Sequence, residues 1–526
     1  MNFFNRTMFF LHRLSGTIVA LFFAMWFLTG LVLIYHPYPR VDDRMKQAHL
    51  ETIPDTLPAI KPFLDKIDGT AKHISVHQQL GQTLIELSTS DKDYTFCTDT
   101  TQQQKAITEE ALMQIASRWV EGTPVRKDTI YDREQWVLYE RFKSEMPMVH
   151  LTYDDPDKSE LFISSNTGEV HQWTTRKSRF WAYIGAIPHK LYFPFIRKDL
   201  DTWKWCIYIG GFTCLIAALT GLYVGIYVLV RRRLKKKVWE NPYKKFVYRW
   251  HEFIGLGMGL FMILWGFSGM FIMERIPQWI APYEGDYTIS ASRFWGRKPL
   301  PLNAYKLDYT QLAEVYKDIK AVDWTHFGSV PVYAVVNADS TVYIDASKST
   351  PEPVEVSSEE ILKCAIKVIS RGKSEGGSTH GHATHMTRTS LSEKEKADTV
   401  SPSRKETPAP KIEKSDCSIE LLTAYDEYYS DRDNEYPLPV YKVDINNADG
   451  SRFYVSPHTG EVRYSNHNRR VKRWAVTAIH YLKIQALMEH KVLWTICIWT
   501  LCLGGAFVSL TGAWLGLKWI KRSIKT

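Results

Sequence analysis

The chain has 526 residues and a formal net charge of +9 at pH 7, with 45% hydrophobic and 23% charged residues. Its mean hydropathy is −0.25, and its length exceeds what one soluble core usually holds, so the apolar residues must be concentrated in segments. The basic residues flank those segments, which excludes a nucleic-acid footprint as the reason for the positive charge.

Four segments carry no Asp, Glu, Lys or Arg over the length of a membrane span. A helix needs about 20 apolar residues to cross the roughly 30 Å hydrocarbon layer, where it satisfies its own backbone hydrogen bonds. The segments lie between Arg13 and Arg40, between Lys204 and Arg231, between Glu252 and Glu274, and between Lys491 and Lys518. We therefore predict four transmembrane helices.

The loop after the second span sets the expected orientation. It has nine Lys or Arg residues between positions 231 and 249 against a single acid, Glu240, and the C-terminal end is basic as well. Short loops rich in Lys and Arg remain on the cytoplasmic side of a membrane. We expect both termini in the cytoplasm and the two long segments, about 37–200 and 275–490, on the outer face.

Each outer segment has the pattern of a small α+β unit. In the first segment, Thr108 with Glu109 and Glu110 predicts the start of a helix that runs to about Trp119. In the second, Ser357 opens a capping box before an apolar helical stretch. Alternating apolar and polar residues predict strands at 83–87, 161–164, 332–336 and 342–345.

A polar insertion at 371–415 interrupts the second outer segment. It is made of Gly, Ser, Thr, Pro, Lys and Glu, a composition that cannot bury a core, so we expect disorder. It contains the histidines His380, His382 and His385. Two interpretations stay open for them: a site for a divalent transition metal, or a solvated linker that contains histidines.

The sequence also repeats itself. His12 precedes Thr29-Gly30 by the same spacing as His251 precedes Ser268-Gly269. A second set recurs at a common offset of 291 residues: His189, Trp203, Cys206 and Thr220 correspond to His480, Trp494, Cys497 and Thr511. Four histidines therefore occupy two pairs of equivalent positions.

Together these patterns predict a membrane α-helical protein, in which a four-transmembrane-helix bundle built from two internal repeats carries two extracytoplasmic α+β domains. In chain order the predicted parts are transmembrane helix 1 at 1–36, a first outer domain with an interfacial helix at 37–200, transmembrane helix 2 at 201–230, a basic cytoplasmic loop at 231–250, transmembrane helix 3 at 251–274, a second outer domain at 275–490, and transmembrane helix 4 with a cytoplasmic tail at 491–526.

The paired histidines favour a haem protein. His12 and His251 begin equivalent spans at the cytoplasmic end, so their side chains should lie at similar depth, and two facing imidazoles can hold one haem iron. His189 and His480 lie in aromatic stretches typical of short interfacial helices at the outer leaflet. For a single histidine at a span end the alternative is an interfacial residue. His36 competes for the outer position, where its counterpart is Arg275.

Further motifs resemble a known family, the PepSY-associated transmembrane proteins. They are the first span from His12-Arg13 to Thr29-Gly30, the helix with Arg, Trp and His before the second span, Tyr425-Asp426 with Tyr428-Tyr429, Pro437-Leu438-Pro439-Val440, Phe453-Tyr454-Val455 and Thr459-Gly460-Glu461. The resemblance implies PepSY-like outer domains, a multi-pass protein of the bacterial inner membrane, and two haem b groups held by His12, His251, His189 and His480.

The resemblance further implies a haem-dependent reductase that passes electrons from a cytoplasmic or quinol donor to a ferric siderophore. Candidate contacts to an anionic, oxygen-rich ligand are Tyr425, Tyr428, Tyr429, Arg432 and Arg452. Two alternatives stay open. A PepSY protein without a cofactor could bind or regulate an envelope partner such as a peptidase, and a transporter would need polar residues inside the spans, where few occur.

Overall fold

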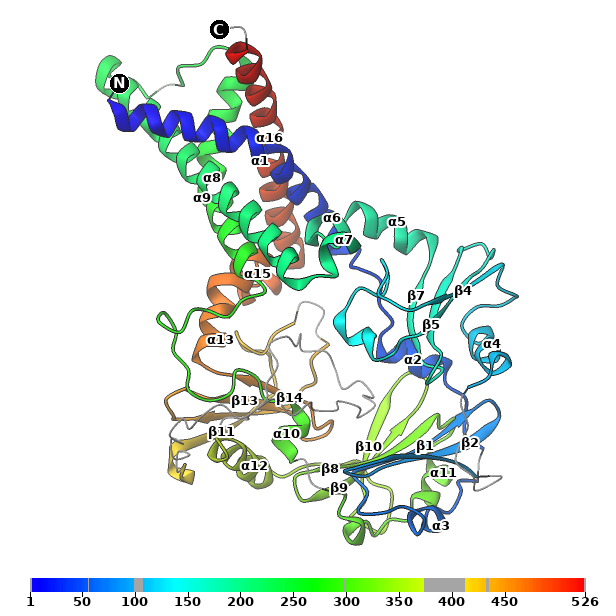
Figure 1. Ribbon diagram of the computed structural model, residues 1–526. Coiled ribbons are helices and arrows are strands. Elements are labelled where there is room, and N and C mark those ends of the chain that lie inside the picture. The colour runs from blue at the N-terminus through cyan, green and yellow to red at the C-terminus, as the bar shows by residue number, and fades with distance from the viewer. Residues whose placement is uncertain are drawn as a thin grey trace, which may run out of the picture. The chain divides into compact units, whose positions relative to one another are not determined.

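The computed structural model describes residues 2–54, 56–98, 107–239, 241–296, 299–372, 412–431 and 435–524. The chain divides into two compact units (Figure 1). Unit 1 consists of Met1–Arg40, Val120–Ile276 and Val471–Thr526, and unit 2 consists of Val41–Trp119 and Pro277–Arg470. All four long helices belong to unit 1.

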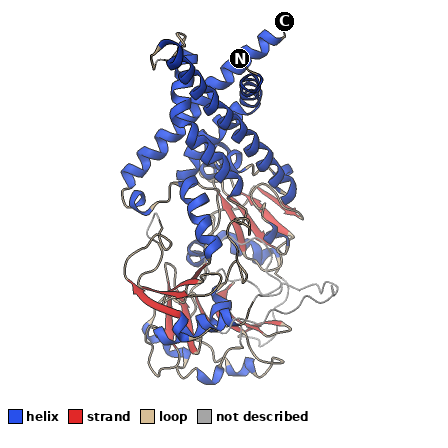
Figure 2. Ribbon diagram, turned by 90° about the vertical axis from the view of Figure 1, so that its left-hand side faces the viewer, coloured by secondary structure: helices blue, strands red, loops and turns tan. Residues whose placement is uncertain are grey.

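The long helices confirm the four predicted spans, because each is long and apolar enough to cross a membrane. Figure 2 shows them as long blue ribbons at the top of the picture. The second span is the one that extends furthest beyond its prediction, because its helix continues through the basic residues that follow the apolar stretch. The helices are α1 (Phe3–Tyr35), α8 (Leu200–Lys236), α9 (Phe246–Phe271) and α16 (Lys491–Ser523).

Side-chain caps and apolar packing build this bundle. The Asn2 side chain accepts a hydrogen bond from the first turn of α1, and Asp199 does the same for α8, which satisfies backbone N–H groups that a helix start leaves unpaired. Helices α1 and α9 each pack against both α8 and α16, so α1 and α9 lie diagonally across the bundle. Between them lies an apolar core that includes Phe23, Phe27 and Met258.

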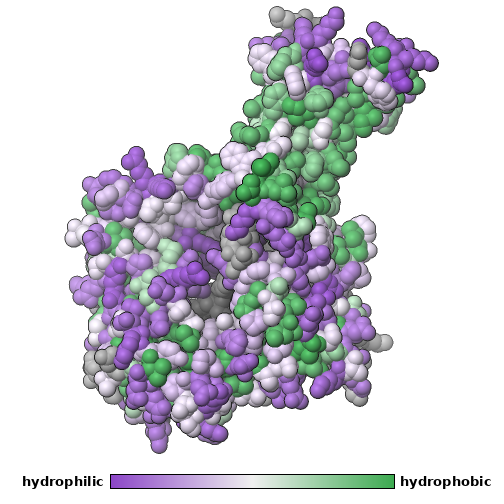
Figure 3. Space-filling model, turned by 180° about the vertical axis from the view of Figure 1, so that it is seen from behind, coloured by the Kyte–Doolittle hydropathy of each residue, from purple (hydrophilic) through white to green (hydrophobic). Residues whose placement is uncertain are grey.

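The surface of the bundle matches a membrane span. Figure 3 shows a hydrophobic band along the long helices and a hydrophilic cap at the end that contains the termini. Apolar side chains such as Leu21, Phe212 and Leu260 are exposed along this band. The chain is therefore a multi-pass membrane protein by the length, composition and surface of these helices.

The rest of unit 1 connects a small sheet to the bundle. The sheet has the strand order β4-β5-β6-β7, all antiparallel, and its core includes Met148, Phe162 and Leu138. Short helices then lead into the spans. The elements are β4 (Arg126–Ile130), η1 (Glu140–Lys143), β5 (Met148–Thr152), β6 (Glu160–Ser164), β7 (Val170–Thr174), α5 (Arg176–Ile184), α6 (Ala186–Lys190), α7 (Pro194–Arg197), the π-helical η5 (Arg473–Ala478), α14 (Ile479–Tyr481) and α15 (Gln485–Met488).

Unit 2 combines parts of both predicted outer segments, 37–200 and 275–490. Its six-stranded sheet has the order β10-β9-β8-β1-β2-β3, so strands of both outer segments form one sheet. The two segments meet where β1 pairs antiparallel with β8, with Ile74 opposite Trp324. Separate domains would leave both strands as open edges, and their pairing removes those edges. The strands are β1 (His73–Gln79), β2 (Gln82–Ser88), β3 (Asp93–Cys97), β8 (Ala321–Phe327), β9 (Val330–Val336) and β10 (Thr341–Asp345).

A second sheet of unit 2 has the order β11-β12-β13-β14, and α12 packs on it through Ile361, Ala365 and Val368. Both predicted helix starts are confirmed, since Thr108 caps α4 and Ser357 caps α12. The elements are α2 (Asp43–His49), α3 (Lys61–Leu64), α4 (Glu109–Ser117), α10 (Ala291–Trp295), η2 (Leu302–Ala304), η3 (Tyr309–Gln311), α11 (Leu312–Val315), α12 (Ser358–Ser370), η4 (Lys414–Asp416), β11 (Cys417–Leu422), β12 (Val440–Ile445), β13 (Arg452–Val455) and β14 (Val462–Ser465), and α13 (His467–Lys472) follows.

The predicted insertion at 371–415 lies mostly outside the described residues. Its last residues are described, and Lys414–Asp416 form the short helix η4 before β11. The prediction of disorder for the segment stays a prediction. His380, His382 and His385 lie outside the described residues, and the prediction about them stays a prediction.

The shared sheet can be tested by cross-linking. In the β1–β8 pair Ser75 lies opposite Asp323, and opposite residues of an antiparallel pair are close enough for a disulfide. We expect the double variant Ser75→Cys, Asp323→Cys to form that disulfide under mild oxidation, detected as a cross-linked peptide by mass spectrometry. Ser75→Cys with Val322→Cys is the control, because neighbouring strand residues face opposite sides of the sheet. Equal cross-linking of both pairs would contradict the register.

Candidate functional site

Two pairs of histidines face each other in unit 1. The rings of His12 and His251 have centroids 6.3 Å apart, and those of His189 and His480 have centroids 6.4 Å apart. His12 is on α1 and His251 on the diagonal helix α9. His189 is on α6 and His480 on α14, outside the spans. The structure thus brings the four predicted histidines together in the predicted pairs.

Each imidazole is held through its Nδ1 atom by a neighbouring long helix. Nδ1 of His12 lies 3.1 Å from the Ala217 carbonyl oxygen of α8, and Nδ1 of His251 lies 3.0 Å from the Thr511 hydroxyl of α16. In the outer pair, Nδ1 of His189 lies 3.1 Å from the Trp26 carbonyl oxygen of α1. Nδ1 of His480 lies 3.2 Å from the Ser268 hydroxyl of α9.

The hydrogen bonds define which ring nitrogen is free. A backbone carbonyl can only accept, so Nδ1 of His12 and of His189 carries the proton. The hydroxyl of Thr511 donates to carbonyl oxygens of its own helix, 2.8 and 2.9 Å away, and therefore accepts from His251. In each of these rings Nε2 is left with its lone pair, which is the state that binds a metal.

A glycine lies against every one of these rings. A Cβ atom on Gly221 would lie 2.7 Å from Cε1 of His12, and one on Gly30 would lie 3.2 Å from Cε1 of His189, so a side chain at either position would crowd the ring. A Cβ atom on Gly512 or Gly269 would lie at the ordinary contact distances of 3.4 and 3.5 Å from Cε1 of His251 and His480. The glycine in each span is therefore a seat for one imidazole. The four seats are Gly221, Gly512, Gly30 and Gly269, each directly preceded by Thr or Ser.

Short helices hold the two outer histidines in place. Both helices end in a leucine with left-handed backbone, Leu191 after His189 and Leu482 after His480. The buried Trp203 donates a hydrogen bond of 2.8 Å to the Lys190 carbonyl oxygen, directly after His189. Trp494, 291 residues later, donates to the carbonyl oxygen directly after His480 at 3.2 Å. The start of each following span thus fixes the helix that carries the histidine.

The environment keeps the outer imidazoles neutral. Burial lowers the pKa of His189 to about 3, and the neighbouring His480 lowers it further. Burial also lowers the pKa of His480 to about 4. Both rings are therefore uncharged at physiological pH, which favours metal coordination over ion pairing.

The spacing within each pair is that of two ligands on one metal ion. An imidazole nitrogen binds a transition metal at about 2.0–2.1 Å, and the ring centroid lies about 1.1 Å behind it, so opposed ligands have centroids about 6.3 Å apart. The separations in the two pairs, 6.3 and 6.4 Å, agree with that value. Among the described residues no third His, Cys, Asp or Glu joins either pair to form a cluster. Each pair can therefore supply two opposed ligands to a metal.

The two sites are separated along the bundle by apolar side chains. His12 and Thr29 are both on α1, seventeen residues apart, which corresponds to about 25 Å of helix. Phe23 stacks on Phe27 between these levels, and Phe27 contacts Trp265 with ring centroids 5.5 Å apart. Apolar side chains therefore pack between the levels of the two pairs.

Glu252 adds a polar group beside the inner pair. It directly follows His251 in α9 and is only 8% exposed. Neither carboxylate oxygen has a hydrogen-bond partner among the described residues. Glu252 is therefore a buried carboxylate, adjacent to His251 in the chain, that sequence analysis did not single out.

His36 has a different environment from the four paired histidines. Its ring stacks on Trp181 with centroids 4.2 Å apart and planes 13° apart. Within the described part of the chain no histidine ring faces it. The structure therefore places His36 at the end of α1 as an aromatic contact, apart from both pairs.

The tyrosines predicted to contact a substrate form a cluster in unit 2. Tyr429 is 2% exposed, stacks on Tyr454 at 5.0 Å and donates a hydrogen bond to the Pro437 carbonyl oxygen. Tyr425, which is half-buried, donates to the Tyr436 carbonyl oxygen. These hydroxyls stabilise the loop before β12, and the buried Tyr429 ring belongs to the core of the cluster. Arg432 lies outside the described residues.

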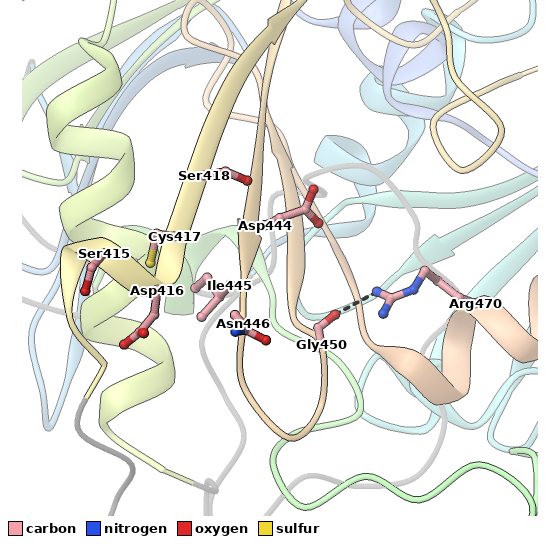
Figure 4. Close-up of a pocket in the computed structure, with 9 residues that line it drawn as sticks. All are labelled: Ser415, Asp416, Cys417, Ser418, Asp444, Ile445, Asn446, Gly450 and Arg470. Carbon is pink, nitrogen blue, oxygen red and sulfur yellow. Dashed lines mark hydrogen bonds between the residues drawn. The ribbon is translucent and has the colours of Figure 1, made fainter.

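Arg452 and Tyr428 lie together at the edge of this cluster. The Arg452 guanidinium lies over the Tyr428 ring, 5.4 Å from its centroid, and forms a two-pronged ion pair with Asp444. Asp444 lines a pocket of about 400 Å³, together with Asp416 and Arg470 (Figure 4). The pocket is within the size range of small-molecule sites, but Asp444 already neutralises Arg452.

Comparison with known proteins gives one match. A family model described as "PepSY-associated TM region" matches residues 9–298, which is more than half of the chain. The matched part contains His12, His189 and His251, and His480 follows it. No curated protein matches the chain.

Sequence analysis missed the role of the hydroxyl–glycine pairs. They served there only as markers of the repeat. The signal was present, because Thr or Ser precedes Gly at the corresponding place in all four spans. The sequence could not show which histidine each glycine contacts, because every histidine lies against a helix other than its own.

The glycine seats can be tested by stability. Gly221→Ala should displace His12 and lose its hydrogen bond, which costs about 0.5–1.5 kcal/mol, whereas alanine normally stabilises a helix by about 0.5–1 kcal/mol. Gly257→Ala is the control, because a Cβ there has no atom within 4 Å. We expect Gly221→Ala to melt below Gly257→Ala in detergent, as measured by differential scanning fluorimetry. Equal melting temperatures would argue against the seat.

Proposed function

Because the chain belongs to the family of PepSY-associated transmembrane proteins, we propose that it is a bacterial inner-membrane haem protein that reduces ferric siderophores on the periplasmic side. The observation that carries the proposal is the pair of opposed imidazoles at two levels of one bundle, 6.3 and 6.4 Å between centroids. The matching order of helices and strands in the two halves of the chain supports an internal repeat as the origin of the two pairs.

Haem b is the cofactor that best fits two ligands per site. A six-coordinate metal held by two opposed imidazoles needs four more ligands in one plane, and a porphyrin provides four nitrogens. The open space at Gly16, one turn after His12, leaves room for a flat group against the helix. His12 and His251 would hold the inner haem, and His189 and His480 the outer one. Bound haem supplies one-electron redox chemistry.

The proposed orientation follows from the basic residues. Helix α8 ends with Arg233, Lys235 and Lys236 in its last turn, and α16 ends with Lys521 and Arg522. These ends form part of the hydrophilic cap in Figure 3 and would lie in the cytoplasm with both termini. The inner pair is then near the cytoplasm, where an electron donor, either a quinol or a cytoplasmic reductant, would deliver electrons.

The proposed reaction transfers one electron to the bound iron. Fe(III) in the siderophore becomes Fe(II), no covalent bond is made or broken in the protein, and the weaker Fe(II) complex releases the metal. Of the predicted contacts, Tyr428 is half-buried, whereas Tyr429 is buried and Asp444 neutralises Arg452. The chain's own residues therefore position redox groups and bind the acceptor, and no nucleophile or acid is needed.

A non-redox role in binding or regulating an envelope partner such as a peptidase is the second candidate. The sheets of both units are consistent with this role, because a binding module needs no cofactor. It gives no reason for two pairs of facing histidines at two levels of unit 1. A colourless purified protein would support this candidate.

The haem ligands can be tested by visible spectroscopy. The oxidised and dithionite-reduced wild type should show the bands of six-coordinate b-type haem. His12→Ala and His480→Ala should each remove about half of this haem, because each removes one ligand of a different site.

His36→Ala is the matched control, since His36 stacks on Trp181 and faces no other histidine in the described residues. Its spectrum should equal that of the wild type. No Soret band in wild type after haem-replete expression would overturn the proposal. If His36→Ala halved the haem absorbance relative to the wild type, the ligand assignment would be overturned.

A further inference from the structure

Side-chain hydroxyls lie beside Nδ1 of both second-half histidines. Nδ1 of His251 lies 3.0 Å and Nδ1 of His480 lies 3.2 Å from a hydroxyl oxygen. In the first half, Nδ1 of His12 and of His189 lies 3.1 Å from a backbone carbonyl oxygen, and His189 also lies 3.3 Å from the Thr29 hydroxyl. Each proposed haem would therefore have a second-half ligand whose hydroxyl neighbour can be replaced.

The inner site shows this difference most clearly. Thr220 and Thr511 occupy equivalent positions, but among the described residues the Thr220 hydroxyl bonds to the Ile216 and Ala217 carbonyl oxygens and to no histidine. The Thr511 hydroxyl bonds to carbonyl oxygens of its own helix and also accepts from Nδ1 of His251. The two equivalent threonines thus have different partners. Thr220 bonds to its own helix, and Thr511 also contacts a histidine.

The outer site has the same kind of contact. The Ser268 hydroxyl is 3.3 Å from the Trp265 carbonyl oxygen and 3.2 Å from Nδ1 of His480. Ser268 is fully buried, so no water competes for this bond. In hydrocarbon an imidazole N–H without a partner is costly, and the hydroxyl is the group that satisfies it.

We propose that Thr511 and Ser268 are positioning residues that orient His251 and His480 and set the electron-donating strength of these two ligands. The inference rests on the proposed haem ligation. An acceptor on Nδ1–H makes the imidazole more basic and fixes its rotation. A more basic ligand favours ferric over ferrous iron, so each hydroxyl lowers the reduction potential of its own haem.

The roles are separable because each hydroxyl serves one site. Thr511 acts on the inner site and Ser268 on the outer site. Loss of a group that orients a metal ligand commonly weakens metal binding about 10–100-fold. We expect Thr511→Val to raise the midpoint potential of the inner haem and to speed its dissociation by about that factor, and Ser268→Ala to do the same at the outer haem.

The experiment measures one haem at a time. Thr511→Val is made in the His480→Ala background, where only the inner haem remains, and Ser268→Ala in the His12→Ala background. Optical redox titration gives the midpoint potential, and transfer of haem to apomyoglobin gives the dissociation rate. Thr511→Ser, which restores a hydroxyl, should return both values toward those of the parent.

Two variants control for the loss of a buried hydroxyl. Ser509→Ala removes one from the same helix, where it bonds only to the Gly505 carbonyl oxygen, and Thr220→Val removes the repeat-equivalent hydroxyl. Neither should shift the inner potential as Thr511→Val does. Equal shifts in Thr511→Val and Thr220→Val, or no shift in either, would overturn the inference. Parents without a Soret band would instead overturn the haem assignment itself.

Discussion

The hydrogen bond from each imidazole Nδ1 to the neighbouring helix is the constraint on which the rest of the site depends. A hydrocarbon layer offers no partner for a ring N–H, so the bundle must provide one at each histidine. The neighbouring helices do this with a carbonyl or hydroxyl oxygen, and a glycine of the same helix lies against each ring. The same bond leaves Nε2 of the ring free for a metal.

This constraint determines how the helices are paired. The seat for His12 is on α8 and the seat for His251 is on α16, so the two diagonal helices place their histidines against different neighbours. For the outer histidines, α1 and α9 provide the seats instead of the histidines. The short helices α6 and α14 place His189 and His480 on these seats. All four spans therefore contribute a seat, and the bundle cannot lose one helix without losing a histidine contact.

The outer histidines need a more elaborate support than the inner ones. They lie outside the regular spans, and each short helix ends at a left-handed leucine and is tied by a tryptophan at the start of the next span. The two halves reach this geometry differently. In the first half the chain breaks at Gly185, where a Cβ would lie 2.7 Å from Val32, whereas in the second a π-helical turn at Arg473–Ala478 precedes His480. π-helical turns are common next to functional residues.

Local patterns were enough to predict the spans, the helix starts at Thr108 and Ser357, and the equivalence of the histidines, because hydrophobic length, capping and repeat spacing are properties of neighbouring residues. The pairing of β1 with β8 and the seat used by each ring could not be predicted in this way. Both join residues some 160 to 260 positions apart, and they depend on edge strands finding partners and on a ring nitrogen finding an acceptor. Those requirements are met only when the whole chain is folded, so tertiary structure decided that Thr511 contacts a histidine and that Thr220 does not.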